Sequence, residues 1–247
     1  MKLMINMAFN KNKKLSEIGK KGAIIRWNKE QNKSKNHLKK ISKSNKYVVL
    51  KARLLGFLAG DGNIDIRYEK NVKKKKHHDI SFYPDHNSMI GPYIEAFTYL
   101  YLKKPTIRKK KNYYSVRISS KTACLDLIKT ADFGIYKWRV PYHFLDTKES
   151  RIEWLKAFFD CEASVSKDQI QVQSVNERGL IQVKNLLNKL GIECSIHEYK
   201  RKNKNWNTNY ILCIKKTEMR IKFLNIIGFN HLIKQQKLKN QLQAKVA

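Results

Sequence analysis

Two acidic residues, Asp61 and Glu162, each follow directly on an apolar segment of the chain. Both segments carry small residues at every fourth position, which lie on one face of a helix and let two helix backbones approach closely. These small residues are Ala52, Gly56 and Gly60 in the first segment and Ala157 and Cys161 in the second. Because both segments are otherwise apolar, we expect two core helices that pack together and bring their terminal carboxylates close to each other.

The position of these acids at helix ends favours a metal site. A helix C-terminus carries partial negative charge, so a carboxylate there needs a compensating cation. Carboxylate oxygens, with coordination positions left for water and phosphate, suit Mg²⁺ and the hydrolysis of phosphodiesters by an activated water. An apolar helix with small residues is ordinarily just packed core, and an Asp-Gly after it is ordinarily a turn. Two such ends in one chain favour the site, with Asp61 and Glu162 as its metal-binding and catalytic residues.

The composition favours a polyanionic partner, because 52 Lys and Arg stand against 20 Asp and Glu, a net charge of +32. Nucleic acid fits best; an anionic membrane surface is the weaker alternative, and a lysine-rich proteome would account for part of the excess. No stretch approaches the roughly 18 apolar residues of a membrane span, and no signal-peptide core follows the start, so we expect a cytoplasmic protein at the chromosome or nucleoid. The cysteines lack metal-ligand spacing and indicate reduced thiols: Cys124, Cys161, Cys194 and Cys213.

Residues 1–50 form a basic N-terminal extension with 14 Lys and Arg against two acids. Its apolar residues predict one short helix, split near Gly22, in a segment that grips phosphate or folds against it. A partly disordered, solubilising arm is the equal alternative. The extension is followed by a first half over 51–134, a connector over 135–149 and a second half over 150–247.

The two halves repeat one plan of helices and strands. The first half is expected to hold helices over 52–59, 89–102 and 121–133, with strands over 63–69, 78–83, 106–110 and 113–119. The second half is expected to hold helices over 151–161, 177–190, 217–227 and 231–243, with strands over 169–174, 192–200 and 210–215. Lys121 and Lys216 follow the last strand of their halves at equivalent positions, which indicates a duplication.

The two helix ends, residues 54–62 and 155–163, resemble the LAGLIDADG motif pair of homing endonucleases. The resemblance covers residues 50–230, and segments 81–85 and 114–121 are similar to archaeal intron-encoded members. It implies an α+β fold of two αββαββα halves in one chain, related by a pseudo-twofold axis, with two curved antiparallel sheets forming a DNA-binding saddle. The second motif departs from the pattern in having Ala157 and Ala163 where the first motif has glycines, and in having Glu162 in place of Asp. These changes keep a small side chain and a carboxylate, but they suggest that the two sites are unequal.

The family's activity implies a monomeric endonuclease that hydrolyses double-stranded DNA with Mg²⁺, for which Mn²⁺ would substitute. Asp61 and Glu162 would each serve one strand across the minor groove, aided by the backbone carbonyls of Gly60 and Cys161, and leave short 3′ overhangs at a long asymmetric site. A basic residue usually assists in this family. We expect Lys121 and Lys216 in this role, with an ordinary exposed lysine as the alternative.

Strand alternation predicts which side chains face the DNA. If Ile64, Ile66 and Tyr68 point inward, then Arg67 points outward, and the same rule applies to the other strands. Arginine suits guanine edges, glutamine suits adenine edges, and strand ribbons fit the major groove, although an ordinary polar sheet face would look the same. The DNA-binding candidates are Arg67, Arg108, Lys110, Ser115, Arg117, Gln169, Gln171, Gln173, His197, Tyr199 and Arg201.

Two other functions fit the same resemblance. An intron-encoded maturase would bind its own intron RNA and assist splicing, and a DNA-binding regulator would keep the fold without chemistry. Retained carboxylates at Asp61 and Glu162 favour the endonuclease. The chain begins with Met and lacks a terminal His-Asn pair, so we expect a free-standing, intron-encoded protein rather than an intein.

Overall fold

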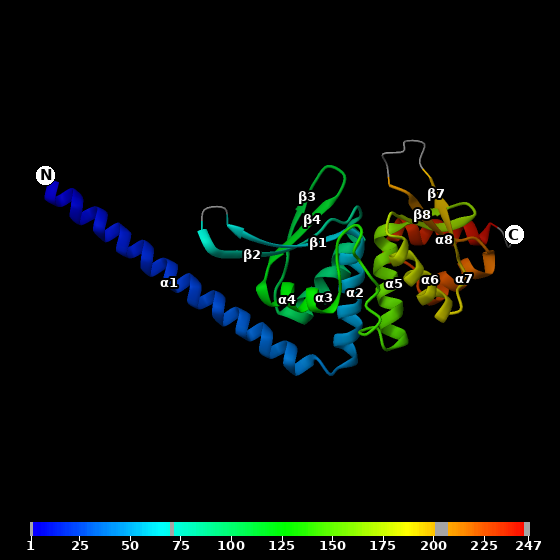
Figure 1. Cartoon of the computed structure of the whole chain (residues 1–247), viewed down its shortest axis with the longest axis horizontal. Helices are drawn as coiled ribbons and strands as arrows, with labels where there is room; N and C mark the ends of the chain where they lie inside the picture. Colours follow the sequence, from blue (N-terminus) through cyan, green and yellow to red (C-terminus); the bar gives the residue numbers. More distant parts are fainter. Residues whose placement is uncertain (1, 70–71, 201–206, 245–247) are drawn as a thin grey trace.

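The structure is a computed structural model that describes residues 2–69, 72–200 and 207–244. Two four-stranded antiparallel sheets lie on either side of a central pair of helices, α2 and α5, which run side by side (Figure 1). The strand orders are β1-β2-β4-β3 and β5-β6-β8-β7, so both halves have the same topology. The predicted duplicated α+β architecture is confirmed.

The elements follow the expected order in both halves, apart from one additional strand in the second half. The first half contains α2 (Asn45–Asp61), β1 (Gly62–Glu69), β2 (Val72–Phe82), η1 (Asn87–Met89), α3 (Ile90–Tyr101), β3 (Thr106–Lys109), β4 (Tyr114–Ser119) and α4 (Lys121–Thr130). The second half contains α5 (Lys148–Glu162), β5 (Ala163–Ser166), β6 (Gln169–Ser174), α6 (Glu177–Lys189), β7 (Ser195–Tyr199), β8 (Asn209–Ile214), α7 (Thr217–Ile226) and α8 (Leu232–Gln243). Strand β5 was not predicted, because its four residues are too few to show alternation.

Side-chain caps fix where the two central helices begin. The hydroxyl of Ser44 accepts a hydrogen bond from the amide of Tyr47, and the hydroxyl of Thr147 accepts one from the amide of Ser150. Each bond satisfies an amide that the first helical turn leaves without a partner. Helix α2 therefore begins at Asn45, several residues before the apolar segment that predicted it.

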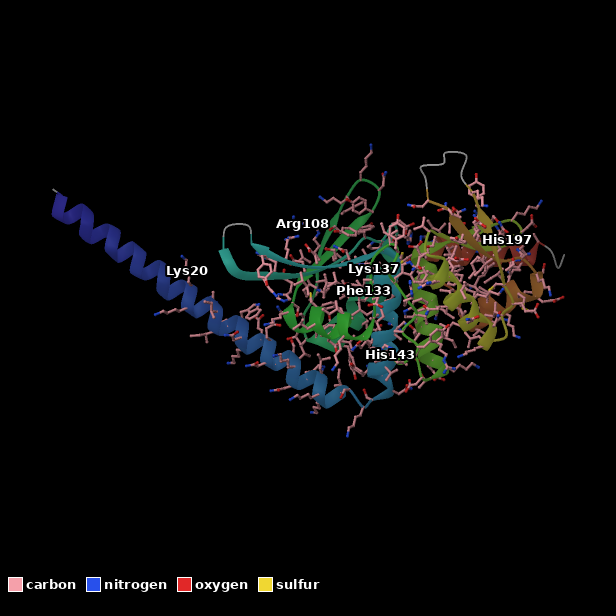
Figure 2. All side chains as sticks on the ribbon, viewed as in Figure 1. Lys20, Arg108, Phe133, Lys137, His143 and His197 are labelled. Carbon is pink, nitrogen blue, oxygen red and sulfur yellow. The ribbon has the colours of Figure 1, made fainter. Side chains whose placement is uncertain are left out.

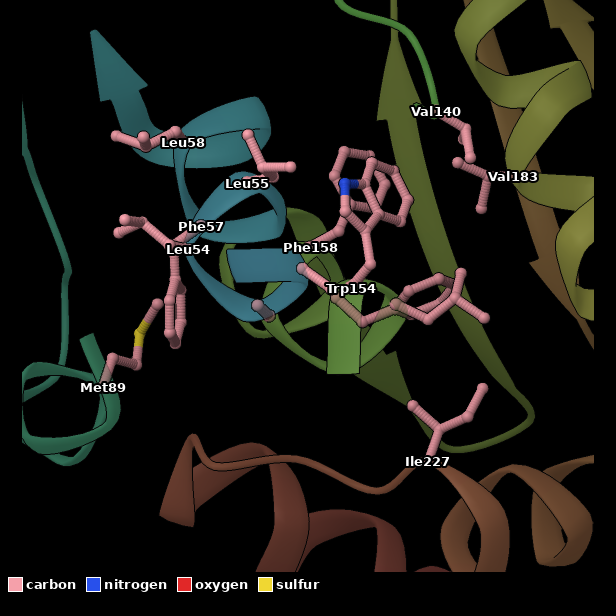
Figure 3. Close-up of a cluster of buried hydrophobic side chains, with 14 of the residues drawn as sticks. Leu54, Leu55, Phe57, Leu58, Met89, Val140, Trp154, Phe158, Val183 and Ile227 are labelled. Atoms are coloured by element: carbon pink, nitrogen blue, oxygen red, sulfur yellow. The ribbon is translucent and has the colours of Figure 1, made fainter. Parts of the chain in front are cut away.

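The backbones of α2 and α5 approach as closely as the small residues allow. A Cβ atom added at Gly56 would lie 2.4 Å from the carbonyl oxygen of Trp154, and one added at Gly60 would lie 2.4 Å from the Cβ of Cys161. The predicted packing of the two small-residue faces is therefore confirmed. Around this contact the core side chains are fully buried, and Trp154 stacks on Phe158 with ring centroids 5.1 Å apart (Figure 3).

Helix α1 (Lys2–Ile41) is a single helix of 40 residues, so the prediction of a short helix split near Gly22 was wrong. A glycine inside a helix costs only about 1 kcal/mol, and no proline interrupts this segment. The carboxy-terminal part docks on the first half: the hydroxyl of Ser34 donates to the carbonyl of Tyr101 at 2.7 Å, and the side chain of Gln31 accepts from the amide of Thr122 at 2.9 Å. The amino-terminal part extends away from both halves (Figure 1).

The predicted inward face of β1 is only partly buried. Ile66 and Tyr68 are exposed by 38% and 58%, which corrects the expectation that they lie in the core. The β1–β2 hairpin extends past the helices that cover its sheet, so Ile66 instead lines an open cavity of about 860 Å³ beside Trp27 of α1 and Leu125 of α4. The inward positions of the other strands are occupied as predicted, with Val116, Ile170 and Val172 buried.

Candidate metal and DNA site

Asp61 and Glu162 are the last residues of α2 and α5, and the packing of these helices brings them together. Burial raises the pKa of Glu162 to about 7, and the negative charge of Asp61 adds to this rise. Burial also raises the pKa of Asp61, while a hydrogen bond from Cys161 lowers it and the charge of Asp85 raises it further. The two carboxylates therefore repel each other in a poorly solvated place, as their position at helix ends predicts.

Glu162 and Gly60 line one open cavity of about 480 Å³. Polar side chains from both halves, Asn63, Gln173 and Asn209, form part of its wall. Glu162 and the helix-end residue Gly60 thus border a space large enough for water and a phosphate group. This side of the acid pair therefore offers the donor set that Mg²⁺ prefers, in which protein oxygens supply only some of the ligands.

The Asp61 side of the pair is filled by residues that follow α7. The ammonium group of Lys234 donates to the carbonyl oxygens of Asp160 at 2.5 Å and of Cys161 at 3.2 Å. His231 lies 3.3 Å from a carboxylate oxygen of Asp85 and stacks on His86. The positive charge of Lys234 lowers the pKa of Asp61 and of Glu162, so it is a cation of the acid site.

Buried Asp160 holds these residues in place. Its carboxylate accepts hydrogen bonds from the amide of His231 at 2.9 Å and from the side chain of Asn230 at 2.8 Å. Burial nevertheless raises the pKa of Asp160 to about 6, because it outweighs those hydrogen bonds. Asp160 thus anchors the segment that delivers Lys234 to the end of α5.

The two sides differ because the segments that close the halves cross over the central helices. After α4, Trp138 packs on Phe158 of the second half with ring centroids 4.9 Å apart. After α7, the amide of Leu232 donates to the hydroxyl of Ser88 in the first half. The first crossing leaves a cavity beside Glu162, whereas the second carries Lys234 to the carbonyls at the end of α5.

The predicted assisting lysines lie away from the acid pair. Lys216 forms a 2.8 Å ion pair with Glu193, and Lys121 lines cavities between α1 and the first half. Neither contributes to the shifted pKa values of Asp61 or Glu162. Lys234 was missed by sequence reasoning, because its helix showed only a general amphipathic pattern and its approach depends on the crossing segment.

The first sheet carries several predicted DNA-binding residues on one hollow surface. Arg108, Ser115 and Arg117 line a shallow cavity of about 310 Å³. The guanidinium of Arg117 donates to the hydroxyls of Ser115 at 3.1 Å and Tyr83 at 3.2 Å, so Ser115 lies on the predicted face but is covered. Arg67 is exposed and pairs with Asp65 and Asp79.

The second sheet presents a comparable polar row. Gln169 donates to Gln171 at 2.8 Å, and Gln173 is exposed next to them on β6. His197 contacts the hydroxyl of Ser195 at 2.9 Å, and Figure 2 shows it and Arg108 on the sheet side of their halves. Lys110 and Tyr199 are exposed, whereas Arg201 lies outside the described residues.

Two absences bear on the site within residues 2–69, 72–200 and 207–244. No group of three or more His, Cys, Asp or Glu side chains is arranged to hold a metal, so a bound ion would depend on backbone carbonyls, water and phosphate. No helix in the same ranges is both long and apolar enough to cross a membrane.

Comparisons with known proteins agree on the fold. Residues 149–228 match the family model described as a LAGLIDADG-like domain. An uncharacterized protein of Methanocaldococcus jannaschii is 28% identical over 176 residues, covering 65% of this chain and 60% of the relative. A probable cell division protein WhiA of Clostridium acetobutylicum is 26% identical over 202 residues, covering 76% of this chain and 59% of the relative. The chain thus spans about three fifths of the length of these two relatives.

Solved structures extend the match to both halves. The homing endonuclease I-DmoI in complex with DNA and Mn superposes with a TM-score of 0.59 at 21% identity, covering 73% of this chain and 97% of that one. Full-length WhiA from Thermotoga maritima gives a TM-score of 0.51 at 18% identity, covering 88% of this chain and 66% of that one. With its two matching sheets and its paired central helices, the chain has the LAGLIDADG homing-endonuclease fold.

Proposed function

We propose that this protein is a site-specific endonuclease that cleaves double-stranded DNA with a divalent metal ion, Mg²⁺ or Mn²⁺. The observation that carries the proposal is the pair of helix-end carboxylates, Asp61 and Glu162, which lie partly buried at the paired ends of α2 and α5 in a chain of net charge +32. Two partly buried carboxylates of like charge favour the binding of a cation, and DNA supplies the phosphate oxygens that complete a metal shell. The DNA complex of I-DmoI with Mn, a protein of the same fold, supports this partner.

Each helix end would serve one strand of a duplex lying across the two sheets. Glu162 and the carbonyl of Gly60 would hold the metal at the open cavity, and Asp61 with the carbonyl of Cys161 would form the corresponding set. The metal, when bound, would activate a water and neutralise charge on the phosphate. Short 3′ overhangs at a long asymmetric site follow from the LAGLIDADG resemblance, as does a monomer acting at the chromosome.

The test substrate is a DNA duplex in which the two sequences that flank the open reading frame are joined directly, without the inserted segment that carries the frame. The measurement is cleavage of this duplex. Wild-type protein should cut this duplex at one site with Mg²⁺ and leave it intact with EDTA. Glu162→Gln and Asp61→Asn should bind the same duplex but cut it at least roughly 100-fold more slowly, because each loses a carboxylate ligand. If the wild-type protein binds the duplex but does not cleave it with either Mg²⁺ or Mn²⁺, the proposed endonuclease activity is refuted.

A DNA-binding protein without chemistry is the second candidate. The similarity to WhiA favours it. That relative matches 76% of this chain and is named as a probable cell division protein, not as a nuclease. The occupation of the Asp61 side by Lys234 also favours it. Under this function Asp61→Asn would leave DNA affinity and specificity unchanged and no metal-dependent cut would be found. A splicing assay with precursor RNA would separately test the maturase.

A further inference from the structure

The carbonyl oxygen of Cys161 already has a cationic partner. The ammonium group of Lys234 donates to it at 3.2 Å and to the neighbouring carbonyl of Asp160 at 2.5 Å. Both carbonyls belong to the last turn of α5, where unpaired carbonyls concentrate negative charge. An ammonium group in this place supplies the charge that a metal ion would otherwise supply.

Hydrogen bonds fix the backbone of the segment that carries Lys234, so its contact with the carbonyls does not depend on a freely moving side chain. Asn230 and His231 both bond to the buried carboxylate of Asp160, and Leu232 bonds to Ser88. His231 also caps α8, because its ring accepts from the amide of Lys234 itself. The side chain of Lys234 thus begins from a backbone fixed on both halves of the molecule.

On the other side of the acid pair, no cationic side chain of the described residues lines the cavity. Gly60 and Glu162 there face the cavity of about 480 Å³, whose described lining includes amides and a hydroxyl but no lysine or arginine. The two positions therefore differ in kind. At one position, Glu162 and Gly60 border open space. At the other, Asp61 lies within the field of Lys234, whose ammonium group already binds the carbonyl of Cys161.

We propose that Lys234 is a built-in cation that occupies the metal position of Asp61 and the Cys161 carbonyl. This inference rests on the proposed endonuclease function, and it means that the two metal positions of the enzyme differ in their availability to a divalent ion. The position at Glu162 and Gly60 takes the divalent ion, so the strand that it serves is cut first. The second strand is cut only when Lys234 leaves the carbonyls, and nicked DNA accumulates.

The test is Mn²⁺ binding, measured by electron paramagnetic resonance on the full chain with a short duplex as the phosphate source. Lys234→Met should bind one more Mn²⁺ per chain than the wild type, because the Cys161 carbonyl becomes available. Lys234→Arg keeps a cation and should retain the wild-type number. Lys237→Met removes the same charge from an exposed position of α8 and controls for the general change in charge.

Cleavage of a supercoiled plasmid carrying the target gives a second measurement. The wild type should accumulate nicked circles, and Lys234→Met should raise the ratio of linear to nicked product several-fold. Equal Mn²⁺ numbers for the wild type and a folded Lys234→Met, with folding checked by the melting temperature, would overturn the role of Lys234. Failure of the proposed function looks different: Glu162→Gln would then bind as much Mn²⁺ as the wild type, whether or not Lys234→Met gains an ion.

Discussion

The backbone of Gly56 lies directly against the carbonyl oxygen of Trp154, so that an added Cβ would come to 2.4 Å from that oxygen. Neither helix can move away without opening the core between the halves. We expect Gly56→Ala to lower the free energy of unfolding by about 1–3 kcal/mol, the usual cost of overpacking a rigid contact. Urea denaturation of the variant and the wild type measures this difference.

Gly22→Ala is the matched control for that substitution. Gly22 also lies inside a helix, but a Cβ added there meets no atom within 4 Å. Alanine should therefore stabilise α1 by up to about 1 kcal/mol and raise the helical signal in circular dichroism. A decrease in stability in Gly22→Ala equal to that in Gly56→Ala would show that helix propensity, and not the contact with Trp154, governs both.

The central helices and the acid pair could be predicted because their signals are local. Small residues at helical spacing and a terminal acid are visible in any short window around Gly56 or Ala157. The place of Lys234 could not be predicted, since it depends on a segment that crosses from one half to the other and is held by Asp160. The exposure of Ile66 also depends on tertiary structure. The alternation of residue types shows which side chains share a face of the strand, but it does not show how much of that face the helices cover.

Metal binding should depend on pH around neutrality. The pKa of Glu162 lies at about 7 because of burial and the charge of Asp61, so below this pH a proton occupies the carboxylate that the metal needs. We expect the affinity for Mn²⁺ to rise from about pH 6 to about pH 8, by roughly tenfold per unit below the pKa, and to level off above it. A titration at three pH values checks this, and a flat profile would contradict the shifted pKa.

Stability without metal should move in the opposite direction. The pKa of Glu162 is higher in the folded state, about 7, than its ordinary value of 4.5, so the folded protein binds a proton that the unfolded chain has lost. This contribution therefore falls as pH rises between these two values. Glu162→Gln should remove it and stabilise the metal-free protein at about pH 8 by on the order of 2 kcal/mol. Equal melting temperatures of variant and wild type at that pH would argue against a destabilising charge.

Helix α1 should contribute to DNA affinity by neutralising phosphates. Lys20, Lys21, Arg26 and Lys29 are exposed along it, and Figure 2 shows Lys20 on the part that extends away from the halves. Replacing all four with glutamine should reduce the slope of log affinity against log salt by about 0.9 for each phosphate that α1 no longer neutralises. Fluorescence anisotropy at several salt concentrations measures the slope.

The control for that charge change replaces four exposed lysines elsewhere, Lys129, Lys222, Lys237 and Lys239, on helices α4, α7 and α8. It alters the net charge by the same amount but removes no residue of α1. The salt slope should change less than in the α1 variant. Equal changes in both variants would mean that overall charge alone, rather than an interaction of α1 with DNA, sets the affinity.

Arg117 should read a base, whereas Lys110 should bind phosphate. Hydrogen bonds to Ser115 and Tyr83 hold Arg117 on the hollow face of the first sheet. A guanidinium fixed in this way can donate two hydrogen bonds to one guanine. Arg117→Ala should weaken binding to the target by about 1–3 kcal/mol and relax the preference at one base pair. Lys110→Ala should weaken binding to all duplexes alike. Affinities for a set of duplexes with single base changes separate the two effects, and an unchanged base preference in Arg117→Ala would assign Arg117 to the DNA backbone instead.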